Sequence, residues 1–449
     1  MIKIGLISLG CSKNQVDSEL ILGNISSDDN LEIIDDLNIA DIIIINTCGF
    51  IQAAKEESID TILEAVRLKE TAELKGVIVT GCLTQRYKDE ILREIPEVDA
   101  ILGTGTFGDI NKVIEAVLKG DRVSNIGNPS YSYKASLPRI ITDSHFAYVK
   151  IAEGCNNNCT YCSIPKIRGP FYSRTMDDII QEVKLLTDKG VKEIILVAQD
   201  ITRYGEDLYE KAVLADLINN ILKSNPDIKW LRLMYSYPEN ISDEIIKLIA
   251  KEDRICNYLD LPIQHSSNKI RKLMNRRGSR EDLVYLINKI RQYIPDIVIR
   301  TSLIVGFPGE GEAEFNDMID FIREVKFDRL GVFKYSREED TAAANFCGQI
   351  SDEIKEERYN KVMEIQQEIS YNNNQEFINK ELEVIIDEID ENAAIARSKY
   401  DAPEIDNQVY ISAKDIKIGE IVKCNIKEAY EYDLIGELKN DVAKNEFTK

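Results

Sequence analysis

The strongest chemical signal in the sequence is a set of three closely spaced cysteines, Cys155, Cys159 and Cys162. Three thiolates at this spacing can bind three corners of a [4Fe–4S] cluster and leave the fourth iron without a protein ligand. A zinc knuckle is the structural alternative, but zinc needs a fourth Cys or His nearby, and neither Cys256 nor His145 has the usual spacing. The motif therefore indicates an iron–sulfur cluster with one open coordination position.

A second set of cysteines is dispersed along the chain but shares one position relative to predicted strands. Cys11, Cys48 and Cys82 each follow a short apolar run, at residues 2–9, 39–45 and 77–80. The ends of parallel strands meet at one edge of a sheet, where α/β proteins bind their ligands. We therefore expect these three thiols to converge and to hold a second cluster, again with one iron open. The alternative is that they are three ordinary half-buried thiols.

The elements that must position these cysteines separate into three regions. Residues 1–135 alternate short apolar runs with helical periodicity, which predicts a Rossmann-like parallel α/β domain. Residues 136–374 restart the alternation with six strand–helix units, too few for a closed eight-stranded barrel but suited to a partial (β/α)6 barrel. Residues 375–441 change to period-2 alternation, which is typical of a small antiparallel β-barrel.

Polar residues and glycines follow the strands of the predicted partial barrel, on the edge where such barrels carry their sites. Each of them alone could be an ordinary polar group at the start of a loop, but as a set they suit a cofactor pocket. The candidates for cofactor binding are Gln199, Gln264, His265, Gly306, Glu310 and Tyr335, together with Tyr161 inside the cysteine motif.

Composition narrows the class of protein further. The 449 residues include 78 acidic and 56 basic residues, a formal charge of −22, which argues against a surface built to bind DNA or another polyphosphate. The sequence has no unbroken apolar run of about 18 residues, so we expect no membrane span. Nine cysteines are too few for a secreted disulfide scaffold, and we expect a cytoplasmic protein whose thiols are free to bind metal.

The cysteine spacing, with an aromatic residue before Cys162, resembles the radical S-adenosylmethionine superfamily. Longer strings resemble one family within it, the methylthiotransferases, and most closely the RimO branch. These strings are residues 10–19 (GCSKNQVDSE), 46–51 (NTCGFI), 258–265 (YLDLPIQH), 332–336 (VFKYS) and 401–405 (DAPEI). The resemblance covers the chain from residue 1 to about 440 and implies an N-terminal cluster domain, a radical S-adenosylmethionine core and a C-terminal TRAM barrel.

The resemblance implies an enzyme with two [4Fe–4S] clusters and two uses of S-adenosylmethionine. One molecule methylates sulfur held at the N-terminal cluster. The second is cleaved at the Cys155, Cys159 and Cys162 cluster, and its radical removes a hydrogen from the β-carbon of an aspartate in ribosomal protein S12. The implied partners are S12, free or in the small ribosomal subunit, and an electron donor such as flavodoxin or ferredoxin. Because a carbon radical must be shielded, we expect both open irons to face one cavity between the first two domains.

Two other functions remain open from the sequence. Sibling branches of the family methylthiolate the 2-position of adenosine in transfer RNA, and an iron–sulfur scaffold without catalysis is a further possibility. A barrel that binds RNA should be basic and aromatic, whereas an acidic barrel suits a basic ribosomal protein. The acidic residues of this region are Asp387, Glu388, Asp390, Glu391, Asp401, Glu404 and Asp406.

Overall fold

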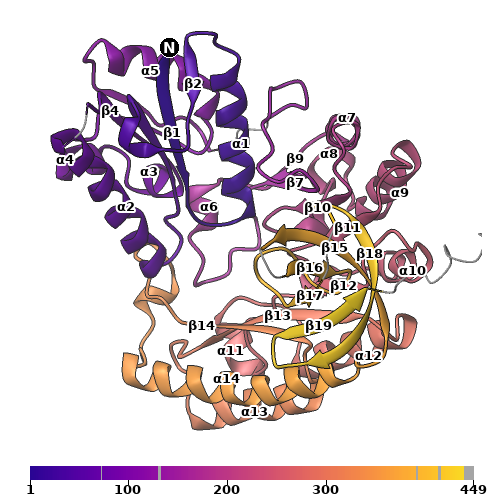
Figure 1. The fold of residues 1–449 in the computed structure, drawn as a ribbon. Helices are drawn as coiled ribbons and strands as arrows, with labels where there is room; N and C mark the ends of the chain where they lie inside the picture. The colour runs from indigo at the N-terminus through magenta and orange to yellow at the C-terminus, as the bar shows by residue number, and fades with distance from the viewer. Residues whose placement is uncertain (72, 130–132, 391–392, 413–415, 439–449) are drawn as a thin grey trace, which may run out of the picture.

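The computed structural model describes residues 1–71, 73–129, 133–390, 393–412 and 416–438, and Figure 1 shows how they divide into three parts. An N-terminal α/β part comes first, and a curved sheet with outer helices follows it. A small β-barrel lies against the concave side of that sheet. This is the architecture that the sequence predicts. No helix among the described residues is long and apolar enough to cross a membrane.

The N-terminal part is built on a six-stranded parallel sheet. Its strands, in spatial order, are β2 (Leu31–Ile33), β1 (Ile2–Ser8), β3 (Ile42–Thr47), β4 (Gly76–Gly81), β5 (Ala100–Leu102) and β6 (Val123–Asn125). All residues of β3 and β4 are buried, because helices cover both faces of the sheet. The chain moves from β2 to the other side of β1, so the strand order reverses between β1 and β3, which is where open α/β sheets bind ligands.

The helices of this part divide between the two faces of the sheet. One face packs against α1 (Ser12–Ser26) and α5 (Ile110–Leu118). The other packs against α2 (Gln52–Thr71), α3 (Cys82–Tyr87) and α4 (Asp89–Glu94). Sequence periodicity identified the long helices but missed α3 and α4, which are one and a half turns each and too short to show a period.

The central part is a partial barrel of six parallel strands. They are, in order, β7 (Phe146–Lys150), β10 (Glu193–Val197), β11 (Trp230–Leu233), β12 (Tyr258–Asp260), β13 (Val298–Val305) and β14 (Arg329–Lys334). The two halves of the sheet are joined between β11 and β12 by the bonds Leu231 N to Arg254 O (2.7 Å) and Cys256 N to Leu231 O (2.9 Å). The six strands predicted from the sequence are therefore confirmed, with shorter limits.

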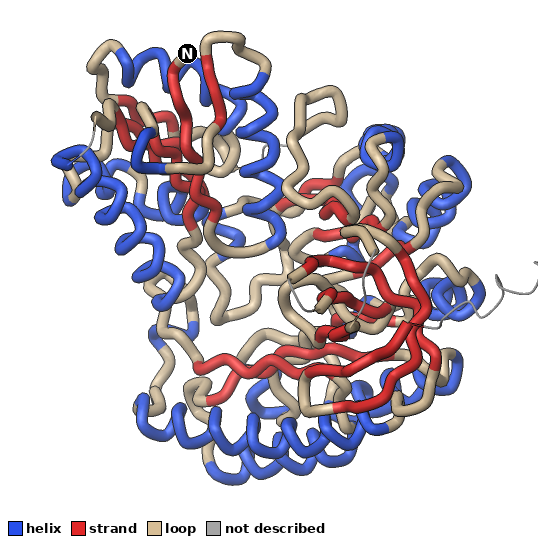
Figure 2. The backbone as a smooth tube through the Cα atoms, in the orientation of Figure 1, coloured by secondary structure: helices blue, strands red, loops and turns tan. Residues whose placement is uncertain are grey.

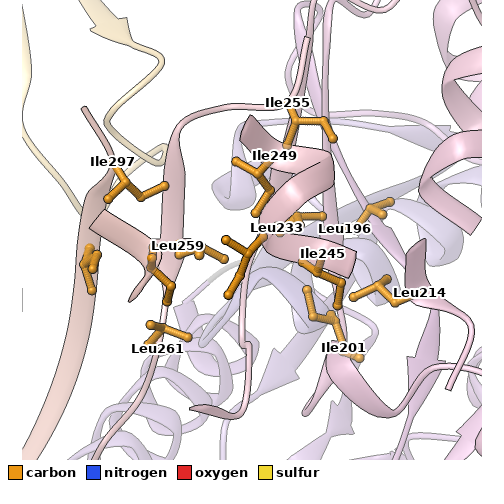
Figure 3. Packing of buried hydrophobic residues seen from close by; sticks show 14 of the residues in the cluster. Leu196, Ile201, Leu214, Leu233, Ile245, Ile249, Ile255, Leu259, Leu261 and Ile297 are labelled. Atoms are coloured by element: carbon orange, nitrogen blue, oxygen red, sulfur yellow. The ribbon is translucent and has the colours of Figure 1, made fainter. Parts of the chain in front are cut away.

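Helices cover the outer, convex side of the partial barrel and bury a continuous aliphatic core against it (Figures 2 and 3). They are α7 (Met176–Asp188), α9 (Leu214–Ser224), α10 (Asp243–Lys251), α12 (Arg280–Tyr293), α13 (Glu312–Val325) and α14 (Asp352–Gln375). A second core lies on the concave side, where α1 of the N-terminal part packs over Phe146, Tyr148 and Trp230. The first two parts of the chain therefore share a hydrophobic core.

The C-terminal part is a closed five-stranded barrel. Its strands close in the order β15 (Glu381–Ile389), β16 (Ala394–Ser398), β17 (Gln408–Ile411), β19 (Asp433–Leu438) and β18 (Ile421–Ala429). The pairing of β17 with β19 is parallel, and the other pairings are antiparallel. A period-2 pattern gives no strand direction, so the sequence could not predict this exception.

The acidic stretch of this barrel is used differently from the sequence expectation. Asp387 accepts hydrogen bonds from His145 (2.7 Å) and Arg397 (2.8 Å). Asp401 accepts from Arg329 (2.7 Å), and Asp406 lies 3.4 Å from Arg300. These three carboxylates fasten the barrel to the central part, so the expectation that the whole stretch faces a basic partner is wrong for them. Glu391 lies outside the described residues.

Candidate active site

The N-terminal cysteines lie at adjacent strand ends on one edge of the sheet. Cys11 follows β1 and precedes α1, Cys48 follows β3, and Cys82 follows β4 as the first residue of α3. A methyl group placed on Gly10 would lie only 3.4 Å from Cys48 Sγ. The loops that carry these three cysteines therefore lie beside one another at this edge of the sheet.

One asparagine connects the loops that carry these cysteines. The Asn14 side chain donates to Leu9 O (2.8 Å), two residues before Cys11, and to Thr47 O (3.0 Å), next to Cys48. Its Oδ1 lies 3.6 Å from Cys82 Sγ. Asn14 is almost fully buried, so its amide fixes the positions of the three loops relative to one another.

The turn before Cys82 requires a glycine at position 81. Gly81 has φ of +101°, a conformation that strains residues with a Cβ. A Cβ on Gly81 would lie 2.4 Å from Asn46 Oδ1 and 2.5 Å from Thr47 O. This close approach of β4 to β3 sets the start of the Cys82 segment next to Thr47, the residue before Cys48.

The second cysteine set occupies the loop after β8 (Ala152–Glu153), at the carboxyl edge of the partial barrel. Cys155 N donates to Gly169 O (3.2 Å), and Cys162 N donates to Cys159 O (3.0 Å), which closes the loop on itself. Thr160 N donates to Met274 O at the end of α11 (Asn268–Leu273), at 3.1 Å. The three thiols are half-buried, so a ligand can reach them.

Burial disfavours the thiolate form in both sets, and nearby cations outweigh burial at Cys11. Burial raises the pKa of Cys48 to about 12 and the pKa of Cys155 to about 11, so both are protonated at neutral pH without metal. Burial would also raise the pKa of Cys11, but the charges of Lys13 and Arg168 outweigh it and lower that pKa below its usual value. Metal binding must therefore displace protons from most of these thiols.

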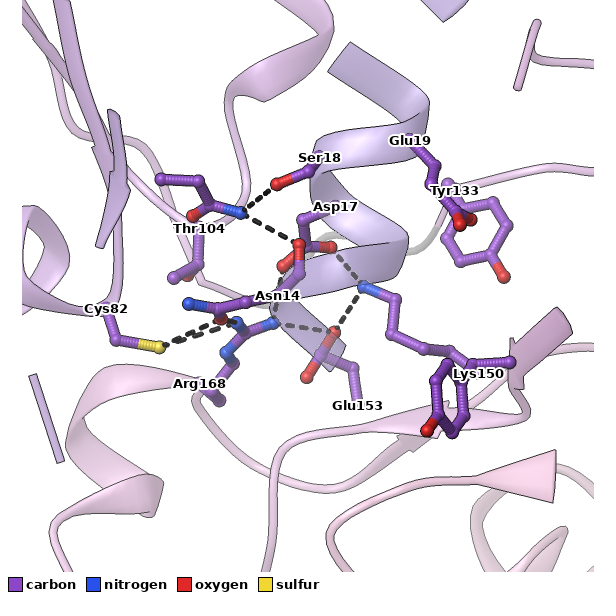
Figure 4. A network of polar contacts seen from close by, with 12 residues as sticks. Asn14, Asp17, Ser18, Glu19, Cys82, Thr104, Tyr133, Lys150, Glu153 and Arg168 are labelled. Carbon is purple, nitrogen blue, oxygen red and sulfur yellow. Dashed lines mark hydrogen bonds and ion pairs between the residues drawn. The ribbon is translucent and has the colours of Figure 1, made fainter. Parts of the chain in front are cut away.

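A buried polar network around Arg168 reaches Cys82 of the N-terminal set (Figure 4). Arg168 follows the short helix α6 (Ile164–Ile167), directly after the second set, and reaches Asp17 (2.9 Å) and Cys82 Sγ (3.4 Å) in the N-terminal part. Lys150 donates to Glu153 (2.9 Å) and to Asp17 in the same network. Residues that flank the second set in the sequence, Glu153 and Arg168, thus belong to a charged cluster that contacts Cys82 of the first set.

A tyrosine of the central part lies against the N-terminal cysteine loop. Tyr235, just after β11, has φ of +63°, which is an uncommon conformation for a residue with a side chain. Its hydroxyl lies 3.4 Å from Ser12 Oγ, and its ring lies 3.3 Å below the Lys13 ammonium. The backbone is held in this shape by the bond from Tyr235 N to Asp260 Oδ2 (3.0 Å).

The predicted rim residues fall into two groups. His265, Glu310 and Gly306 lie together behind the strand ends. His265 Nε2 is 3.3 Å from Glu310, and Glu310 accepts from Gly306 N (3.0 Å) and from Arg358 (2.8 Å). Their side chains are fully buried, so in this structure they hold the loop after β13 in place.

The remaining rim candidates lie closer to the cysteine motif. Gln199 donates to Glu153 (2.8 Å), and Gln264 follows β12 in a left-handed conformation, with φ of +73°. Tyr161 and Tyr335 both pack edge-on against Phe307, at ring distances of 6.5 and 5.3 Å. This aromatic stack connects the cysteine motif to the end of β14.

Buried polar atoms that lack a hydrogen-bond partner indicate whether this rim suits a polar cofactor. Within the part of the chain that the structure describes, three such atoms follow three of the barrel strands: Gln199 Oε1 after β10, Ser236 Oγ after β11 and Tyr335 Oη after β14. Buried polar atoms are nearly always hydrogen-bonded in folded proteins. Three unsatisfied ones on the same edge as an open cysteine triad fit a site that receives a polar ligand.

Sequence reasoning missed several residues of this site. Asn14 lies within the string of residues 10–19, but its link to three loops needs the fold. Arg168 and Cys82 are 86 residues apart and in different parts of the chain, so no periodicity connects them. Of the three cysteines without a predicted role, Cys256 and Cys424 are buried as packing residues would be, whereas Cys347 is exposed.

Comparison with known families identifies each part of the chain. The radical SAM superfamily model matches residues 149–322, and the TRAM domain model matches residues 378–438. The uncharacterized protein family UPF0004 matches residues 3–103, which include Cys11, Cys48 and Cys82. Each of these matches lies within one part of the observed fold.

Two relatives are similar to almost the whole chain. The ribosomal protein uS12 methylthiotransferase RimO of Clostridioides difficile is 50% identical over 446 residues, which are 99% of this chain and 100% of the relative. The protein of the same name from Desulforamulus reducens is 50% identical over 444 residues, which are 98% of this chain and 100% of the relative.

Solved structures with a related fold are far more distant in sequence. The radical S-adenosylmethionine methyltransferase TsrM from Kitasatospora setae, solved with cobalamin and a [4Fe–4S] cluster, has a TM-score of 0.57 at 12% identity. That match covers 76% of this chain and 73% of TsrM. The cobalamin-dependent S-adenosylmethionine radical enzyme OxsB has a TM-score of 0.53 at 13% identity, over 82% of this chain and 56% of OxsB. These similarities concern the fold.

Proposed function

The chain belongs to the RimO family of ribosomal protein uS12 methylthiotransferases, and from this premise we propose that it inserts a methylthio group at the β-carbon of one aspartate of uS12. Radical S-adenosylmethionine chemistry is the family's means of breaking an unactivated C–H bond. The single structural observation that supports the proposal is the segment Arg168–Gly169, which contacts Cys82 of one cysteine set and the Cys155 backbone of the other.

We propose that Cys155, Cys159 and Cys162 hold one [4Fe–4S] cluster and that Cys11, Cys48 and Cys82 hold a second. The first supplies the electron that cleaves S-adenosylmethionine to a carbon radical, and the second holds the sulfur that becomes the methylthio group. Three thiolates for each cluster leave one iron open to S-adenosylmethionine or to sulfur. The convergence of each set, described above, supports this assignment.

The rim residues then have separable tasks. Gln199 and Tyr335, whose buried polar atoms lack partners, are proposed to contact S-adenosylmethionine together with Tyr161 and Gln264. Gly306, Glu310 and His265 are proposed to shape the backbone of the same pocket, because Glu310 binds the Gly306 amide and Arg358. The proposed pocket is at the carboxyl edge of the barrel. Contacts of Tyr235 and Arg168 with the N-terminal part at that edge support the proposal that water is excluded from the radical.

We further propose three functional units, 1–135, 136–374 and 375–441. The family matches at 3–103, 149–322 and 378–438 each lie inside one of them, which supports this division. The proposed substrate is uS12, free or in the small ribosomal subunit, and this substrate implies action in the cytoplasm. A one-electron donor such as flavodoxin or ferredoxin completes the reaction.

The test is complementation followed by mass spectrometry of uS12. A bacterium deleted for its own enzyme should lack the methylthio group on one uS12 aspartate and should regain it when this chain is expressed. The Cys48→Ala chain should fail to restore it, and Cys424→Ala should succeed because Cys424 lies in the terminal barrel. Failure to restore the uS12 group, with restoration of a methylthio group on transfer RNA adenosine in a second strain that lacks that modification, would contradict the proposal.

A further inference from the structure

Arg168 belongs to the central part of the chain but contacts a cysteine of the N-terminal part. Its Nη2 donates to Cys82 Sγ at 3.4 Å, and its side chain is only 2% exposed. Figure 4 shows the guanidinium between Cys82 on one side and Asp17 and Glu153 on the other. A cation with so little solvent around it has a strong electrostatic effect on the atoms that it touches.

The guanidinium is held in one orientation by its other bonds. Nη1 donates to Asp17 Oδ2 (2.9 Å) and Glu153 Oε2 (3.3 Å), and Nη2 also donates to Asn14 Oδ1 (2.5 Å). Four of the five N–H groups of the fork therefore have acceptors, one of which is sulfur. Asn14 is the residue that links the three N-terminal cysteine loops. The orientation of the Arg168 guanidinium is therefore coupled to the position of those loops.

The backbone beside Arg168 is fixed to the other cysteine set. Gly169 O accepts the hydrogen bond from Cys155 N at 3.2 Å. The two segments approach so closely that a Cβ on Gly154 would lie 2.1 Å from Pro170 O. A two-residue segment, Arg168 and Gly169, thus contacts one cysteine of each set.

We propose that Arg168 is a positioning residue for the N-terminal cluster, which orients the Cys82 thiolate and raises the reduction potential of the cluster that it binds. Hydrogen bonds to ligating sulfur and nearby positive charge stabilise the more negative, reduced cluster. The radical-generating part of the chain thereby sets the electronic state of the sulfur-donating part. The inference rests on the proposed function in one respect, that Cys82 is a cluster ligand.

The test measures a potential in a full-length chain that carries only the N-terminal cluster. Cys155→Ala, Cys159→Ala and Cys162→Ala are combined, the chain is reconstituted anaerobically, and the cluster is titrated against redox dyes with EPR detection. Adding Arg168→Gln should shift the midpoint potential to more negative values. Lys150→Gln is the matched control: Lys150 binds the same two carboxylates, Asp17 and Glu153, but no cysteine. It should leave the midpoint where it is in the parent.

A second variant covers the case in which Arg168→Gln fails to fold. Arg168→Lys keeps the positive charge for Asp17 and Glu153 but lacks the planar fork that reaches Asn14 and Cys82 together. It should fold and should show a smaller shift in the same direction. A midpoint equal to the parent's in either folded Arg168 variant, or an equal shift in Lys150→Gln, overturns the inference and makes Arg168 purely structural.

Failure of the premise gives a different result. If Cys82 is not a ligand, Cys82→Ala in the same background retains the cluster with its iron content and EPR signal unchanged, and the proposed N-terminal site is wrong. If Cys82→Ala loses the cluster while the Arg168 variants keep the parent potential, the site stands and the inference about Arg168 alone falls.

Discussion

The Asn14 side chain of one cysteine loop donates a hydrogen bond to the Thr47 carbonyl oxygen of the next, at 3.0 Å, and is nearly free of solvent. The same amide donates to Leu9 O at 2.8 Å. The spacing between Cys11 and Cys48 therefore depends on one side chain that is not itself a metal ligand. Residues around metal ligands often control the affinity of a site in this way.

We expect Asn14→Ala to lose the N-terminal cluster and keep the other. Two buried carbonyl groups lose their donor, which costs about 1–3 kcal/mol of folding free energy and loosens the two loops. Iron content after reconstitution should fall to about half of the parent value, for one cluster of two. Asn24→Ala, in the same helix with an amide that bonds only within the helix, should bind iron like the parent. Full iron content in Asn14→Ala would show that the amide is dispensable.

The two cysteine sets should separate the two half-reactions. Cys159→Ala should abolish formation of 5′-deoxyadenosine from S-adenosylmethionine and reductant, because the radical-generating cluster is lost. Cys48→Ala should still form 5′-deoxyadenosine but add no methylthio group to uS12. Chromatography of the nucleoside and mass spectrometry of uS12 measure the two steps. Equal loss of 5′-deoxyadenosine in both variants would refute this division.

The sequence predicts much of this site because its cysteines lie at positions that topology fixes. Cys11, Cys48 and Cys82 each follow a strand of the parallel sheet, and adjacent parallel strands end at one edge. Only the strand order was needed to bring them together. The Cys155 motif is local, with all three residues in one loop, so its spacing alone carries the chemistry.

The contacts that cross between parts of the chain could not be predicted from the sequence. Arg168 is an ordinary cation by composition, and its bond to Cys82 depends on how α6 packs against α3. The prediction that the acidic residues of the terminal barrel face a basic partner was wrong for the same reason. Asp401 pairs with Arg329, and Asp406 pairs with Arg300; both arginines lie on strands of the central part. A count of charges in the sequence does not show which residues form such ion pairs.

Substitutions at two glycines test whether the loop that carries Cys155 requires its backbone to pass close to residues 169–170. Gly154 and Gly120 both have positive φ, +69° and +86°, but a Cβ on Gly154 would overlap Pro170 O, whereas Gly120 has open space around it. We expect Gly120→Ala to cost about 1–2 kcal/mol through its conformation alone. Gly154→Ala should cost about 3 kcal/mol because the backbone must also move.

Urea unfolding and iron content measure both effects of these glycine changes. Gly154→Ala should lose the iron bound at the Cys155 set, since the Cys155 N to Gly169 O bond cannot form when the two segments move apart. Gly120→Ala should retain all of its iron. Similar losses of iron in the two variants would mean that general destabilisation, and not the approach of these segments, determines cluster binding.

The attachment of the terminal barrel should depend on pH through Asp387. Burial alone would raise the pKa of Asp387, but the hydrogen bond from His145 and the charge of Arg397 outweigh it and lower that pKa below the usual value. A carboxyl group with a lowered pKa in the folded state stabilises the fold above about pH 4, and this contribution is lost as the pH falls towards the folded-state pKa. Asp387→Asn should therefore cost about 2 kcal/mol at neutral pH and less at about pH 3.5, where part of the contribution is lost.

Urea unfolding at the two pH values measures this difference between Asp387→Asn and the parent chain. Glu388→Gln is the matched control, because Glu388 is the exposed neighbour on the same strand and its change should have little effect at either pH. A difference for Asp387→Asn that stayed constant between the two pH values would mean that the ionised carboxylate does not hold the barrel. In that case the neutral contacts of β15 with the central part, and not the charge of Asp387, would account for its share of docking.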